Sequence, residues 1–179
     1  MEKEADLLPR ILDAAGIGKA SLFGHSDGGT IALLAAAKHP DRIESIVVEA
    51  GHVFIEPVTL EGIRSALEAF HATDLRARLA KYHGDKVDAL FEAWAGTWLS
   101  EEFRAWNIER FLPSIRCPVL VIQGDKDEYA TEAQADAVLR QVKGPGTKAW
   151  LNGVAHAPHK EAVEEVLAAT SAFLLGVGR

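Results

Sequence analysis

The sequence predicts an α/β protein, a three-layer sandwich with a mostly parallel sheet of about four strands and a long helical insertion. Short apolar runs rich in β-branched residues alternate with helical patterns, so we expect helical crossovers between parallel strands. The strand runs are continuously apolar, which is typical of a sheet covered on both faces. No repeat or linker divides the 179 residues, so a single domain spanning 1–179 is expected.

Each expected strand is a short apolar run bounded by turn-forming residues such as glycine, proline, aspartate or asparagine. The four runs are 20–23, 45–48, 119–122 and 148–151. Apolar residues at helical spacing predict the helices around this sheet. These helices are 5–15, 30–38, 132–142 and 160–175.

The segment 57–112 interrupts this rhythm, because it contains only helical patterns and no convincing strand. Its expected helices are 60–70, 74–82, 86–98 and 101–111. It carries Trp94 and Trp98, four residues apart, and it falls between two strands, where ligands often bind in such sheets. An apolar lid over a pocket fits this pattern, and so does a helical hairpin with a core of its own. Both interpretations remain open.

Composition and charge exclude several classes of function. The net charge of −7 argues against nucleic acid and anionic membrane as partners, because both require a basic face. No apolar stretch approaches the ~20 residues that span a bilayer, and the N-terminus has no signal-peptide pattern, so we expect a cytoplasmic protein. The single cysteine cannot form an intramolecular disulfide. Because no metal-ligand spacing or glycine-rich nucleotide motif is present, we expect neither metal nor cofactor.

The most informative motif is Gly24-x-Ser26-x-Gly28, which leads from a strand directly into a helix. A serine on so sharp a turn exposes its hydroxyl above the sheet, and flanking glycines permit the turn. The following helix directs its free N–H groups at an oxyanion, so the N–H of Asp27 is the expected donor. His25 is expected to support the turn and, with Trp94 and Trp98, to contact substrate.

Two later loops supply partners for the serine, in the order acid and then histidine. Asp127 follows the third strand and is preferred as the acid over Asp125 and Glu128, which we interpret as loop charges or helix caps. His156 follows the last strand and is preferred as the base over His159, which is expected to cap the final helix or lie on the surface. A histidine placed between the acid and the serine can transfer the hydroxyl proton to a leaving group.

With these residues placed, the chain resembles the α/β-hydrolase fold family of esterase-like and lipase-like serine hydrolases. Residues 24–29 resemble the family's nucleophile turn and 124–127 its acid loop. His156 resembles its histidine motif, with Ala155 in place of the usual glycine. The position of 57–112 is similar to that of the family's helical cap. The resemblance implies a catalytic triad of Ser26, Asp127 and His156, with no metal.

The chain departs from the family before the serine turn, where members place four strands and a loop that supplies a second oxyanion donor. Three explanations are open: a fragment of a longer protein, a minimal hydrolase, or a partner that covers the exposed strand. A long apolar edge strand without a partner promotes association. We therefore expect a homodimer formed around a two-fold axis.

The expected activity is hydrolysis of a small or medium apolar carboxylic ester through an acyl-serine intermediate. Two alternatives remain. The same triad is compatible with cleavage of amides, thioesters or carbon–carbon bonds, because a fold does not fix the reaction. The missing oxyanion loop instead suggests a catalytically inactive module that binds a ligand or partner.

Overall fold

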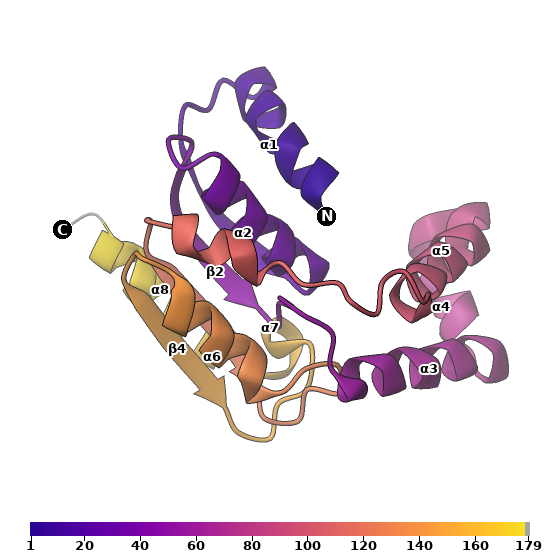
Figure 1. The fold of residues 1–179 in the computed structure, drawn as a ribbon. Coiled ribbons are helices and arrows are strands. Elements are labelled where there is room, and N and C mark those ends of the chain that lie inside the picture. Colours follow the sequence, from indigo (N-terminus) through magenta and orange to yellow (C-terminus); the bar gives the residue numbers. More distant parts are fainter. Residues whose placement is uncertain (178–179) are drawn as a thin grey trace. The chain divides into compact units, whose positions relative to one another are not determined.

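Four parallel strands form one sheet in the order β1-β2-β3-β4 (Figure 1). The strands are β1 (Ala20–His25), β2 (Ile43–Glu49), β3 (Val119–Gly124) and β4 (Gly146–Leu151). Every expected strand is present, and each extends the predicted run by two to three residues. β1 is one edge of this sheet, and its Phe23 side chain is 49% exposed.

Helices cover both faces of the sheet, as the α/β prediction requires (Figure 1). Gly29 approaches Val48 on one face, and Val166 packs against Val47 on the other. Neighbouring residues of a strand point to opposite faces, so the helices that carry Gly29 and Val166 lie in different layers. These helices are α2 (Asp27–Lys38) and α8 (Val163–Val177), accompanied by α1 (Glu2–Ala14), α6 (Glu132–Gln141) and the short α7 (Pro158–Glu161).

The segment after β2 forms a compact helical unit, Ile55–Trp106, while Met1–Phe54 and Asn107–Arg179 form the sheet unit. The elements of the helical unit are α3 (Pro57–Ala72), α4 (Leu75–His83), η1 (Gly84–Lys86) and α5 (Val87–Leu99). Its interior is aromatic: the rings of Phe70 and Phe91 stack with centroids 4.0 Å apart. The segment therefore has a core of its own.

The helix expected over 101–111 is not formed. Residues 101–105 form turns, Asn107 pairs with Phe54 in an isolated antiparallel bridge, and a 3₁₀ helix, η2, follows at Glu109–Ser114. The Asn107 side chain accepts a hydrogen bond from the N–H of Glu109 at 2.7 Å. Such a bond favours a turn over a continuing helix. The helical unit therefore ends before the expected boundary at residue 112.

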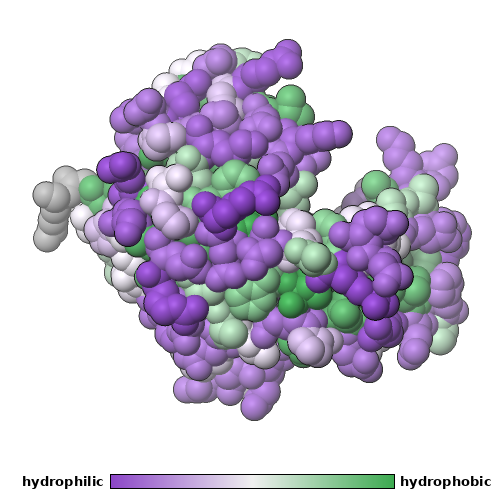
Figure 2. Space-filling view, viewed as in Figure 1, coloured by the Kyte–Doolittle hydropathy of each residue, from purple (hydrophilic) through white to green (hydrophobic). Residues whose placement is uncertain are grey.

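The structure describes residues 1–177. Within this range no helix combines the length and apolar character needed to cross a bilayer. The face of the molecule in Figure 2 is mainly hydrophilic, with smaller apolar areas between the polar ones.

Candidate active site

Ser26 lies on the sharp turn between β1 and α2. Its backbone has φ 55° and ψ −123°, outside the regions that most residues occupy, and such a conformation costs about 1–3 kcal/mol. A Cβ atom at Gly24 would lie 2.1 Å from the backbone oxygen of Gly28, so only glycine fits there. At Gly28 a Cβ would meet no described atom within 4 Å, and the second tight position is Gly29. The expected requirement for glycine at position 28 was therefore wrong.

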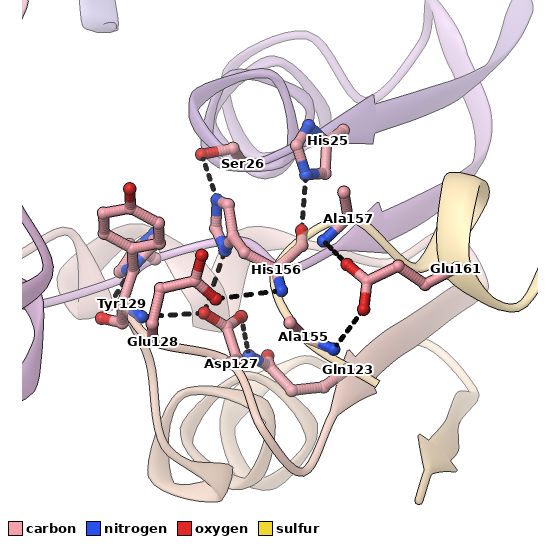
Figure 3. Close-up of polar contacts among 11 residues, drawn as sticks. His25, Ser26, Gln123, Asp127, Glu128, Tyr129, Ala155, His156, Ala157 and Glu161 are labelled. Atoms are coloured by element: carbon pink, nitrogen blue, oxygen red, sulfur yellow. Dashed lines mark hydrogen bonds and ion pairs between the residues drawn. The ribbon is translucent and has the colours of Figure 1, made fainter. Parts of the chain in front are cut away.

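The three side chains predicted to act together form one series of hydrogen bonds (Figure 3). His156 Nε2 lies 2.9 Å from Ser26 Oγ, and His156 Nδ1 lies 2.9 Å from Asp127 Oδ1. A carboxylate only accepts, so Nδ1 carries the proton and Nε2 accepts from the serine hydroxyl. In this state the imidazole can act as a base toward Ser26.

The acid is held by two further donors. Gln123 Nε2 donates to Asp127 Oδ2 at 2.6 Å, and the N–H of Tyr129 donates to Oδ1 at 2.9 Å. The Asp127 side chain is fully buried, so these bonds replace the hydration that burial removes. Its rival Asp125 instead accepts from the N–H of Gly153 at 2.6 Å.

The loop that carries His156 is tied down on both sides of the histidine. Glu128 accepts from the N–H of His156 at 3.2 Å. Glu161 accepts from the N–H groups of Ala155 and Ala157 at 2.8 and 3.3 Å (Figure 3). Glu128 was expected to be a loop charge or a helix cap. In the structure its carboxylate helps to order the loop of His156.

His25 supports the same loop rather than the serine turn alone. Its Nε2 donates to the backbone carbonyl of His156 at 2.7 Å, and the two rings are 5.0 Å apart. Burial lowers the pKa of His25 below its ordinary value, so the ring is held in its neutral form. The hydrogen bond of its ring to this loop favours a supporting role over the expected contact with substrate.

Two side chains near His156 were not predicted to take part in the site. The Tyr129 ring lies 4.6 Å from that of His156, and burial raises the pKa of its hydroxyl. His52 is 3% exposed and bonds through Nε2 to the carbonyl of Tyr129 at 3.1 Å. Tyr129 lies two residues after Asp127 in the chain, and this position was the available signal.

The two tryptophans expected to contact substrate differ in how far the helical unit buries them. Trp98 is 4% exposed, with its ring 5.2 Å from Phe103 and 5.6 Å from Trp106, so it is a core residue with little surface to offer a ligand. Trp94 is partly exposed. It lines an apolar depression of the helical unit together with Leu79, His83, Val87, Leu90 and Phe91.

A parallel sheet with a serine on a strand-to-helix turn, followed in the chain by acid and histidine loops, is the architecture of the α/β-hydrolase fold. A family model described as "alpha/beta hydrolase fold" matches residues 3–84. The chain is 32% identical over 158 residues to the serine hydrolase BPHL of Homo sapiens, covering 80% of this chain and 50% of that protein. It therefore spans about half the length of this relative.

The chain is also similar to solved structures of this fold. One is a membrane phospholipase A described as a bacterial virulence factor, with a TM-score of 0.76, 22% identity, and coverage of 98% of this chain and 63% of that one. Another is the proline iminopeptidase of Mycobacterium smegmatis, with a TM-score of 0.68, 20% identity, and coverage of 97% and 70%. The chain belongs to the α/β-hydrolase fold family.

Proposed function

We propose that this chain is a serine hydrolase that cleaves a carboxylic ester through an acyl-serine intermediate. The observation that carries the proposal is the series of 2.9 Å contacts from Ser26 through His156 to Asp127. This arrangement of a nucleophile, a base and an orienting acid is the one that acyl transfer requires. Similarity to a protein named as a serine hydrolase supports the same class.

In the proposed reaction, Ser26 Oγ forms a bond to the ester carbonyl carbon while its proton moves to His156 Nε2. Asp127 stabilises the resulting imidazolium. The N–H of Asp27, at the start of α2, donates to the oxyanion. The tetrahedral intermediate then expels the alkoxide, which takes the proton from His156. Water, deprotonated by the same histidine, attacks the acyl-serine; the carboxylic acid leaves, and Ser26 Oγ takes the proton back from His156.

The test is turnover of p-nitrophenyl acetate and butyrate, together with labelling by a fluorophosphonate probe, which reacts only with an activated serine. We expect hydrolysis and stoichiometric labelling of the wild-type chain, and neither in Ser26→Ala. A Ser26→Ala variant that hydrolyses at the wild-type rate would refute the assignment. A folded wild-type chain without labelling would favour an inactive binding module instead.

The bond that is cleaved is a separate question, because the similar structures include both a phospholipase and an iminopeptidase. The apolar depression around Trp94 supports an apolar acyl or alcohol group, if the helical unit serves as a cap. A panel of matched p-nitrophenyl esters, p-nitroanilides and thioesters distinguishes the chemistries. We expect esters to have the highest kcat/KM.

We also propose that the chain forms a homodimer through β1. This strand is a sheet edge, and its Phe23 pairs in register with Val47, whose face α8 covers. Phe23 is 49% exposed, so an apolar side chain of this edge strand is available to a second copy of the chain. Light scattering at micromolar concentration should give a dimer, and Phe23→Lys a monomer. A monomeric wild-type chain contradicts this proposal.

A further inference from the structure

Glu49, the last residue of β2, contacts both the serine turn and the histidine loop without belonging to the Ser26–His156–Asp127 series. Its backbone carbonyl accepts from the N–H of Ser26 at 2.8 Å. Its carboxylate accepts from His159 twice, from the backbone N–H at 2.6 Å and from Nδ1 at 2.8 Å. The Glu49 side chain is fully buried. One residue therefore connects the segment that carries the nucleophile to the segment that follows the base.

His25 completes this connection from the neighbouring strand. It pairs in register with Glu49, its ring lies edge-on to that of His159 at 4.8 Å, and its Nε2 donates to the carbonyl of His156. The loop is thus held at His156 itself and again three residues later at His159. We refer to His25, Glu49 and His159 as the brace.

The backbone next to Glu49 is strained in the same way as the serine turn. Among the described residues, the non-glycine residues with positive φ are Ser26, at 55°, and Ala50, at 51°. They follow neighbouring strands, and Ala50 comes directly after Glu49. Strain of this kind persists only where surrounding contacts enforce it, and it tends to cluster at functional sites.

The same three side chains also suggest a metal site as an alternative to the hydrogen-bonded brace. One donor atom from each of His25, Glu49 and His159 lies within 4.8 Å of the others, and two histidines with a carboxylate suit transition metals. However, His25 Nε2 and His159 Nδ1 each face an acceptor, so each carries a proton there. A metal would therefore have to use His25 Nδ1 and His159 Nε2, whereas both carboxylate oxygens of Glu49 already accept hydrogen bonds from His159. The contacts favour a hydrogen-bonded brace.

We infer that Glu49 is a positioning residue, which acts through His159 and together with His25 to hold His156 in line with Ser26. This inference rests on the proposed function. Since a misplacement of about 1 Å can cost about 10²-fold in rate, loosening the loop should lower kcat. It should leave KM nearly unchanged in variants of Glu49 and His159, because neither residue is assigned a contact with substrate.

The experiment compares Glu49→Gln and His159→Ala with a rescue variant, His159→Asn, whose amide nitrogen can take the place of Nδ1. Val166→Ala is the control. Val166 packs on the sheet in contact with Val47, Leu120 and Ile122, so its truncation lowers stability through lost packing and leaves the brace intact. We expect the first two variants to lose about 10- to 100-fold in kcat and in fluorophosphonate labelling rate. His159→Asn should recover most of the loss, and Val166→Ala should retain the wild-type rate.

Amide hydrogen exchange at residues 155–157 provides a readout that needs no activity. Exchange there should rise in Glu49→Gln and His159→Ala well beyond the rise in Val166→Ala. Unchanged exchange and labelling in both brace variants would overturn the inference. So would loss of wild-type labelling on dialysis against EDTA with recovery on adding Zn²⁺. A wild-type chain that the fluorophosphonate probe does not label contradicts the proposed function instead. In that case the exchange data still decide whether the brace holds the loop.

Discussion

Gln123 Nε2 donates to Asp127 Oδ2 at 2.6 Å, so the C-terminal end of β3 supports the acid. Gln123 is fully buried in a strand that is otherwise apolar apart from its closing glycine. A polar side chain in such a position is costly unless it is bonded, and here the bond holds the carboxylate that faces His156.

Replacing Gln123 with leucine should therefore affect stability and activity together. The substitution leaves a buried carboxylate oxygen without this donor, which costs about 1–3 kcal/mol in the free energy of unfolding. Urea denaturation measures the loss, and p-nitrophenyl butyrate turnover should show a lower kcat. Gln123→Glu should be worse, because it places a second carboxylate beside Asp127. Equal stability of the leucine variant and the wild type would contradict this account of the bond.

The two candidate acids should separate clearly by substitution. In Asp127→Asn the amide no longer fixes the proton on His156 Nδ1, and a wrong tautomer costs about 10⁴-fold in kcat. Asp125→Asn retains an oxygen for the N–H of Gly153 and should stay within about threefold of the wild-type rate. The assignment of the acid is wrong if the losses are reversed.

The fold was predictable where local pattern decides it, as in the apolar run Val119–Gly124 of β3 and the glycine at position 24. The failure over 101–111 has a local cause, because the Asn107 side chain competes for the N–H of Glu109. The Glu49–His159 pair joins residues 110 positions apart, and no spacing rule connects them. Sequence pattern predicted Ser26, His156 and Asp127 as one group, and their side chains are in hydrogen-bond contact, whereas the residues that hold them depend on tertiary contacts.

The serine turn offers a matched pair of glycine substitutions. In Gly24→Ala the new Cβ would lie 2.1 Å from the backbone oxygen of Gly28, and the backbone must move. We expect a loss of about 3 kcal/mol or more in the free energy of unfolding and loss of fluorophosphonate labelling. Gly28→Ala meets no described atom within 4 Å and should fold like the wild type. Thermal melts of the two variants, recorded side by side, test the difference.

His25 should make stability depend on pH. Its folded pKa is lowered, mainly by burial, so below the ordinary value of 6.5 the unfolded chain binds a proton that the folded chain does not. The unfolded state then binds more protons, and stability falls as pH decreases from 6.5 to the folded pKa. Above pH 6.5 the ring is neutral in both states, so His25 does not make stability depend on pH there.

The variant His25→Gln isolates this contribution, because its amide can still donate to the carbonyl of His156 but does not titrate. Urea denaturation between pH 5 and pH 8, about the range in which an unperturbed histidine changes charge, should give a shallower pH dependence in the variant. NMR titration of the His25 ring should give a midpoint below 6.5. A midpoint at or above this value would show that burial does not control the ring.

Trp98 and Trp94 should respond in different ways to truncation. Trp98 is 4% exposed among the rings of Phe103 and Trp106, so Trp98→Ala should destabilise the helical unit by about 3–5 kcal/mol. Trp94 is partly exposed beside the apolar depression, so Trp94→Ala should mostly preserve folding and raise KM for butyrate more than for acetate esters. Steady-state kinetics with both esters tests the proposed cap. If Trp94→Ala changes neither KM, the helical unit is better regarded as a separate packing unit than as part of the substrate site.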